Sequence, residues 1–130
     1  MSPSARVGPR EAERSRRRAS RRHDDEELAR FFQGLADPTR VEILAFLFDG
    51  PKTAGDIVRH IGRQQPTVSS HLTCLRFCGY VEARRDGRNV RYELVDRRVR
   101  TLMALGARYL DENARRIMGC RVIAAEREES

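Results

Sequence analysis

The sequence lacks the features that indicate a membrane segment or a disulfide-linked secreted protein. Its longest apolar run, Val41 to Phe48, contains Glu42 and is far shorter than the roughly 20 residues of a membrane span. The arginine-rich N-terminus has no apolar stretch typical of a secretory signal, so we expect a cytoplasmic protein. Three cysteines occur among the 130 residues, and three thiols cannot all pair within one chain. We therefore expect free thiols, which are available for metal binding or redox chemistry.

The positive charge is concentrated at the N-terminus, whereas no Ser-His-Asp set or carboxylate pair typical of an enzyme stands out. Residues 1 to 22 hold eight arginines against two glutamates, which is +6 of the formal net charge of +7. Because this segment has almost no apolar residues, residues 1 to 23 are predicted to be a disordered tail. That tail is either a non-specific phosphate-binding arm, a solvated extension or the product of a misassigned start codon.

Residues 24 to 118 are predicted to form one compact, mainly helical domain. Apolar residues recur at helical spacing after Asp24, after the cap formed by Asp37 and again after Thr53. A glycine, Gly62, ends the third of these helices, and a fourth helix follows within a few residues. Two short helices joined in this way are typical of a helix-turn-helix motif.

A β-hairpin and a long helix complete the predicted domain. Two strand-like runs, 80 to 84 and 89 to 95, flank the hairpin signal Asp86-Gly87, which predicts the wing of a winged helix. Asp96 then caps a last helix whose seam of alternating steps of three and four we interpret as a dimer interface: Val99, Leu102, Gly106, Tyr109 and Asn113. The expected fold is mainly α with a small β-hairpin, a homodimeric winged helix-turn-helix, followed by a C-terminal tail over 119 to 130.

The helix-turn-helix and wing carry the residues expected to bind nucleic acid. From Arg59 to Arg91 there are seven arginines against two acidic residues, a net charge of +5. The candidate DNA-binding residues are Gln64, Gln65, Thr67, Ser69, Ser70, His71, Thr73, Arg85, Arg88 and Arg91. Short hydroxyls and amides can reach base edges, and wing arginines can contact phosphates, so the predicted partner is double-stranded DNA. The alternatives are an ordinary solvated helix face and, for His71, a hydrogen-bonded helix residue or a fourth metal ligand.

Two cysteines lie four residues apart on the predicted fourth helix. At ~100° per residue, Cys74 and Cys78 are ~40° apart and are turned by ~110° from the inward line of Val68, Leu72 and Leu75. Two thiolates on this flank could share a metal ion, completed by a third group. They could equally pack as small apolar residues, whereas a disulfide within one helical turn is disfavoured by its torsion.

Three stretches together resemble the ArsR/SmtB family of winged-helix metal-responsive repressors: LADPTR (35 to 40), QQPTVSSHL (64 to 72) and GYVEARRDGRNVRYEL (79 to 94). The resemblance implies a homodimer that binds an imperfect inverted repeat in operator DNA and releases it when a metal ion binds. The segment HLTCLRFCGYV, with a cysteine after the last helix, resembles that of the cadmium/lead sensors in the family. This implies Cys74, Cys78 and Cys120 as metal ligands, the last from the partner subunit.

The predicted inducer is a soft metal ion, because three thiolates favour such ions. Cd(II) or Pb(II) is expected, with Zn(II), Hg(II), As(III) and Cu(I) as alternatives. The cysteine-containing helix-turn-helix entry of other cadmium and arsenic sensors and the Asp-x-His helix start of zinc and nickel sensors are both absent. Two other hypotheses stay open: a related repressor that responds to As(III) or thiol oxidation, and a cytosolic thiol- or metal-buffering protein without sequence-specific DNA binding.

Overall fold

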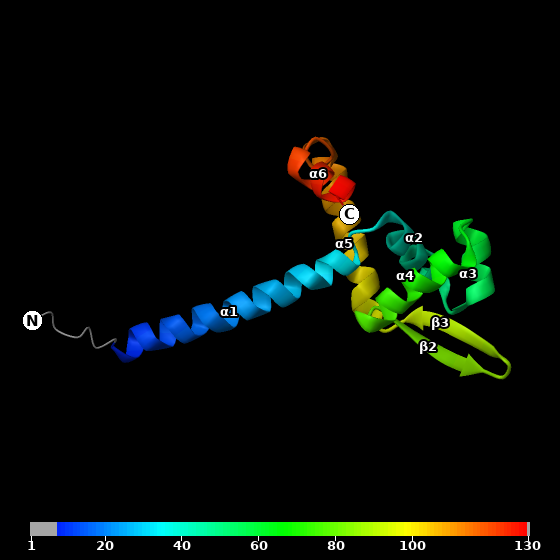
Figure 1. Ribbon diagram of the computed structural model, residues 1–130, viewed down its shortest axis with the longest axis horizontal. Helices are drawn as coiled ribbons and strands as arrows, with labels where there is room; N and C mark the ends of the chain where they lie inside the picture. Colours follow the sequence, from blue (N-terminus) through cyan, green and yellow to red (C-terminus); the bar gives the residue numbers. More distant parts are fainter. Residues whose placement is uncertain (1–7, 130) are drawn as a thin grey trace, which may run out of the picture.

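The computed structural model describes residues 8–129, with all of their side chains except those of 18–23 and 127–129. The elements are, in order, α1 (Pro9–Gly34), α2 (Pro38–Phe46), the short 3-10 helix η1 (Leu47–Asp49), β1 (Lys52–Thr53), α3 (Ala54–Ile61), α4 (Gln65–Phe77), β2 (Val81–Asp86), β3 (Asn89–Leu94), α5 (Arg97–Met118) and α6 (Arg121–Glu129). Helices α2, α3 and α4 and the β2–β3 hairpin form the body, α1 leaves it as a long single helix, and α5 and α6 form a separate branch (Figure 1).

The helix boundaries follow from local capping groups that the sequence predicts. The Asp37 carboxylate accepts hydrogen bonds from the backbone N–H groups of Thr39 and Arg40 at the start of α2. A capping box between Thr53 and Asp56 starts α3. Gly62 ends α3 in the left-handed region, with φ of 72°, which a glycine adopts without steric cost. The predicted helix-turn-helix is thus confirmed as α3 and α4.

One hydrophobic core joins these helices to the wing. Its buried members are Ile43, Leu44, Leu47, Ile57, Val68, Leu72, Leu75, Tyr80, Val81 and Val99, and Phe31 and Leu35 pack against it from α1. The Tyr80 side chain is 1% exposed, and its hydroxyl donates a hydrogen bond to the carbonyl oxygen of Phe31. This core fixes α4 against the C-terminal end of α1.

The wing is a two-residue hairpin within a three-stranded antiparallel sheet. Strands β2 and β3 pair from Val81 with Leu94 to Asp86 with Asn89, and Gly87 adopts the positive φ of 64° that such a turn requires. The third strand, β1, pairs Lys52 with Tyr92 at the other edge of β3. Sequence reasoning missed β1 because two residues are too few to show alternation. The predicted winged helix with a small sheet is confirmed.

The structure shows helix in parts of the two segments that were expected to be a disordered N-terminal tail and a C-terminal tail. Helix α1 extends back to Pro9, so residues 9 to 23 are helical, while residues 1 to 7 of the predicted tail lie outside the described residues. Proline at the first position and a run of arginine, alanine and glutamate favour a helix even without a buried face. The expected C-terminal tail is likewise helical from Arg121 to Glu129.

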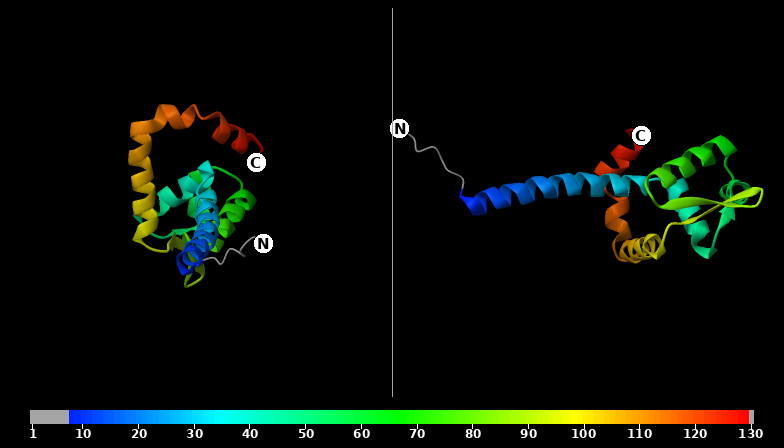
Figure 2. Two further views of the ribbon diagram at one scale, coloured as in Figure 1. Left: turned by 90° about the vertical axis from the view of Figure 1, so that its left-hand side faces the viewer. Right: turned by 90° about the horizontal axis from the view of Figure 1, so that it is seen from below.

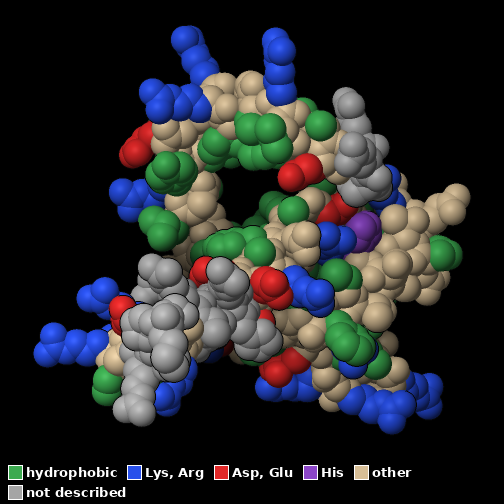
Figure 3. Space-filling view, turned by 60° about the vertical axis from the view of Figure 1, so that its left-hand side comes forward, with side chains coloured by type: hydrophobic (Ala, Val, Ile, Leu, Met, Phe, Trp, Pro, Cys, Tyr) green, Lys and Arg blue, Asp and Glu red, His purple; other side chains and the backbone are tan. Residues whose placement is uncertain are grey.

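Helices α5 and α6 leave a large apolar surface exposed. Val99 from the predicted seam belongs to the core of the chain itself, whereas Tyr109 is 63% exposed. Other exposed apolar side chains of this branch are Leu105, Leu110, Ile117, Met118, Val122 and Ile123. The two helices form an arch beside the body (Figure 2), and hydrophobic side chains gather on the inner side of that arch (Figure 3). A surface of this kind is typical of a protein interface.

Candidate DNA-binding helix and thiol pair

Helix α4 presents a buried apolar face, an exposed polar face and a flank that carries the cysteines. Val68, Leu72 and Leu75 are buried in the core and hold the helix in place. The polar residues Gln65, Thr67, Ser69, Ser70 and Thr73 are exposed, together with Gln64 at the N-cap. The first turn of α4 therefore offers hydroxyls, amides and backbone N–H groups to solvent, which is the arrangement that a recognition helix uses in the DNA major groove.

The wing places arginines at its tip and edges. Arg85 and Arg88 are exposed at and beside the turn. Arg91 is half-buried, and its Nε lies 3.0 Å from the Asp86 carboxylate. Arg84 similarly pairs with Glu93 at 3.1 Å. Ion pairing thus offsets part of the positive charge of the wing, and Arg85 and Arg88 are the members of the predicted set best placed for phosphates.

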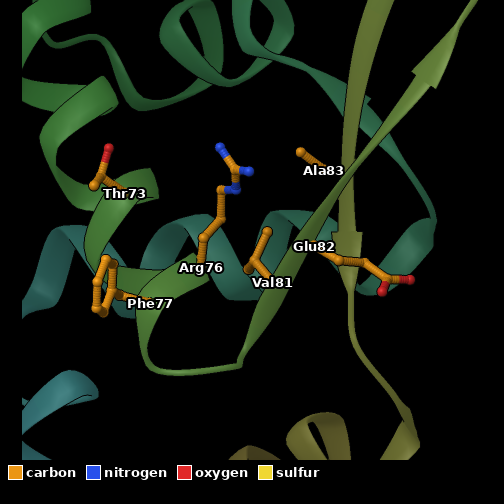
Figure 4. A pocket seen from close by; sticks show the side chains of 6 residues that line it. All are labelled: Thr73, Arg76, Phe77, Val81, Glu82 and Ala83. Carbon is orange, nitrogen blue, oxygen red and sulfur yellow. The ribbon is translucent and has the colours of Figure 1, made fainter.

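Arg76 was left out of the predicted DNA-binding set, but its side chain lies in the space between α4 and the wing. An open groove of about 510 Å³ separates the end of α4 from β2 and is lined by Thr73, Arg76, Phe77, Val81, Glu82 and Ala83. Arg76 projects into this space (Figure 4), and the Phe77 side chain beside it is 92% exposed. The signal that could have identified Arg76 is its position one turn after Thr73 and two turns after Ser69 on the same helix.

His71 is oriented differently from the other candidate DNA-binding residues. Its side chain is 20% exposed, and its Nε2 lies 3.9 Å from the Asp37 carboxylate. Its Nδ1 lies 3.5 Å from a guanidinium nitrogen of Arg40. The imidazole therefore contacts the start of α2 and is directed away from the exposed polar face of α4.

Cys74 and Cys78 form a thiol pair on the flank of α4 that faces α1. Cys74 is half-buried and Cys78 more exposed, and both are free thiols. Burial, the neighbouring Cys74 and a hydrogen bond with it raise the pKa of the Cys78 thiol, against a smaller lowering by the Arg40 charge. The same surroundings, burial first and then the two cysteines, raise the pKa of Tyr80 to about 12. The neighbouring Cys74 thus disfavours the thiolate form of Cys78 in the metal-free protein.

The thiol pair packs directly against the last turn of α1. A Cβ atom added to the buried Gly34 would lie 2.8 Å from Tyr80 Cε2 and 3.4 Å from Cys78 Sγ. Glycine is therefore the residue that permits this close approach. Arg40 closes the same junction, because its Nε donates to the Gly34 carbonyl at 2.7 Å and its Nη2 to the Gln33 carbonyl at 3.1 Å. We call this cluster of Gly34, Arg40, Cys74, Cys78 and Tyr80 the α1–α4 junction.

Cys120 does not complete a site with the thiol pair within one chain. It is half-buried between α5 and α6, where its N–H donates to the Ile117 carbonyl and its carbonyl accepts from Ala124. Among the described residues, no three His, Cys, Asp or Glu side chains come together in a metal-binding group. In the residues that the structure describes, none of the helices combines the length and the apolar composition that a membrane span requires.

The fold and the exposed α4 face define a winged helix-turn-helix DNA-binding protein. Residues 37–83 match the family described as bacterial regulatory protein, arsR family. The chain is 46% identical over 101 residues to the "Probable mercury resistance operon repressor" of Streptomyces lividans, covering 78% of this chain and 81% of that protein. The chain therefore belongs to the ArsR family of transcriptional regulators, which are not enzymes.

Two further relatives have solved structures. The regulator CmtR of Mycobacterium tuberculosis is 51% identical over 69 residues, which are 53% of this chain and 58% of CmtR. The structure of this relative, described as a cadmium metal-sensor, covers 59% of this chain and 81% of that one with a TM-score of 0.52. The homodimeric winged helix-turn-helix domain of Mb0332 from Mycobacterium bovis is 33% identical, with a TM-score of 0.63 over 67% of this chain and 81% of that one.

Proposed function

We propose that this protein is a metal-responsive repressor that binds operator DNA as a homodimer and is released by a soft metal ion. The observation that carries the proposal is the thiol pair on α4, the same helix whose exposed face offers polar side chains to DNA. Relatives named as a mercury resistance operon repressor and a cadmium metal-sensor support a soft ion as the effector. Cd(II), Pb(II) and Hg(II) are the candidates of matching chemistry.

The donor set fits such an ion if a third thiol comes from the partner. Cys74 and Cys78 supply two neighbouring sulfurs, and their thiols would lose protons when an ion binds. Cys120 lies on the α5–α6 branch, whose exposed apolar side chains we assign to the dimer interface. Dimerisation through this branch would carry the partner's cysteine toward the α1–α4 junction, giving two sites per dimer.

The coupling between ion and DNA would act through the position of α4. The thiol pair is rotated by about 110° around the helix from the centre of the polar face, so one rigid element carries both surfaces. An ion held between α4 and a second protomer would bias the tilt of α4 relative to the two-fold axis. Because a dimer must present two recognition helices at a fixed spacing, such a tilt weakens binding to an inverted repeat. Couplings of this kind are typically about 1 to 3 kcal/mol.

The central experiment titrates Cd(II) into the reduced full-length protein. Thiolate-to-metal absorbance reports binding, while fluorescence anisotropy follows a DNA fragment from upstream of the gene of the protein. We expect one ion per protomer and release of DNA. Cys74→Ser and Cys78→Ser should bind DNA but not release it, and Ser69→Ala with Ser70→Ala should bind Cd(II) but lose operator affinity. Metal-free cysteine variants that fail to bind DNA would show that the thiols serve packing instead.

Mixed dimers test whether Cys120 acts across the interface. One protomer carries Cys74→Ser and Cys78→Ser, and the other carries Cys120→Ser. If Cys120 ligates in the partner's site, this heterodimer regains one complete site, whereas each homodimer has none. Absence of the regained site would place all ligands within one chain. Arsenite and peroxide, applied to the same DNA complex, separate metal release from the As(III) and oxidation alternatives.

A further inference from the structure

The N-terminal half of α1 is an exposed helix that the core does not use. From Pro9 to Arg17 and from Asp24 to Arg30, every described side chain is exposed except the half-buried Ala12. The helix joins the body through its last turns, where Phe31 and Leu35 pack against the core. Figure 1 and the right view of Figure 2 show this half extending away from the other elements as a single rod. Packing within the domain therefore does not explain the amino-acid composition of this half of α1.

That composition is strongly basic. Residues 9 to 22 contain seven arginines and two glutamates, a net charge of +5. Arg10, Arg14 and Arg17 follow one another at spacings of four and three, which is one face of a helix. Together with Pro9 and Glu13 these arginines line one shallow surface depression along α1. We call this the arginine face of α1.

Among the described side chains of this segment, the one ion pair neutralises little of the charge of the arginine face. Arg17 Nε lies 3.3 Å from the Glu13 carboxylate, but the two side chains are 72% and 55% exposed. An exposed pair of this kind is weak, so a polyanion can displace it. The N-terminal end of a helix also carries a partial positive charge, which adds to the attraction for anions. The segment offers almost no apolar side chain, and this disfavours a protein partner bound by hydrophobic contact.

We propose that the arginine face of α1 binds the phosphate backbone of DNA flanking the operator, as a second contact independent of sequence. This inference rests on the proposed function, since binding of the helix-turn-helix to its operator is what holds the duplex on the protein. The 14 residues from 9 to 22 span about 21 Å, which is the length of about six base pairs. The arm would thus lengthen the contacted duplex and increase the salt dependence of binding, without changing which operator is chosen.

The test compares the wild type with a triple variant, Arg10→Gln, Arg14→Gln and Arg17→Gln. A control, Arg108→Gln, Arg116→Gln and Arg121→Gln, removes the same charge from exposed positions of α5 and α6. Operator affinity is measured from 50 to 200 mM salt on two duplexes. The short duplex is the stretch of operator that the bound triple variant protects, and the long duplex is the same sequence with 10 added base pairs on each side. Each lost phosphate contact lowers the slope of log K against log salt by about 0.9.

On the longer duplex we expect the wild type and the control to show the steeper slope. The two arms of a dimer make six such contacts, which change the slope by about 5.4, so affinity between the two salt limits should fall about 1,800-fold more than for the triple variant. On the short duplex the three proteins should agree. Equal slopes on the long duplex, or a triple variant altered in dimer dissociation instead, would overturn the inference. Loss of specific binding by every protein on both duplexes would instead refute the proposed function.

Discussion

Arg40 and Arg59 allow a direct comparison between an arginine that joins two helices and an arginine exposed at the surface. Arg59 makes the shorter contact, 2.6 Å to Asp56, but the Arg59 side chain is 74% exposed. Arg40 donates to two backbone carbonyls at the end of α1 and lies beside the thiol pair. Hydrogen bonds from a charged group contribute about 1.5 to 3 kcal/mol each when buried, and water replaces part of that at the exposed Gln33 carbonyl. We therefore expect Arg40→Met to lower the free energy of unfolding by about 2 to 3 kcal/mol.

The matched change Arg59→Met should cost less than about 0.5 kcal/mol, because exposed ion pairs contribute little. Both values come from urea unfolding followed by circular dichroism, in reducing buffer and at one fixed protomer concentration. Arg40→Lys keeps the charge but loses the two-pronged geometry, so its stability should fall between wild type and Arg40→Met. Equal losses for the Arg40 and Arg59 methionine variants would refute the assignment of Arg40 as the residue that holds the end of α1 to the start of α2.

Two further substitutions test the same region by the same unfolding assay. Asp37→Ala should cost about 1 kcal/mol at pH 7 and Asp37→Asn much less, because asparagine still caps α2. Although burial raises the pKa of Asp37, hydrogen bonds from the Arg40 and Thr39 N–H groups and the nearby cations hold that pKa below its usual 3.8. The ionised carboxylate therefore stabilises the fold above pH 3.8. The stability difference between wild type and Asp37→Ala should shrink as the pH falls below that value. Gly34→Ala should cost about 1 to 2 kcal/mol, since crowding against the buried Tyr80 ring outweighs the higher helix propensity of alanine. Gly55→Ala in α3 would meet the movable end of Arg59 at 3.4 Å and the Thr53 hydroxyl at 3.9 Å, both ordinary contacts, so it should be neutral or stabilising; the reverse order would contradict the close approach at Gly34.

Local signals made the winged helix predictable from sequence. Asp37, Thr53 and Gly62 determine helix ends through contacts within a few residues, and the Asp86-Gly87 turn does the same for the hairpin. The flank position of the thiol pair follows from helical geometry alone. These features need no knowledge of what the distant parts of the chain do.

Features that depend on distant residues were not predictable in this way. The contact of Gly34 with Cys78 and Tyr80 joins residues more than 40 positions apart, and a helical pattern carries no trace of it. The orientation of His71 toward Asp37 likewise depends on how α2 crosses α4. Helix α1 before Asp24 was missed because a helix with no apolar face has no periodicity to detect.

The division of α4 into separate faces has a consequence for how regulators of this type can diversify. Under the proposed function, substitutions at Gln65, Ser69 or Thr73 would change operator preference while Cys74 and Cys78 stay in place on another side of the helix. Changes at the thiols would alter which ion is sensed while the DNA sequence that is recognised stays the same. Duplicated copies of such a gene could therefore acquire new targets and new effectors as independent traits, and a designer could exchange one without rebuilding the other.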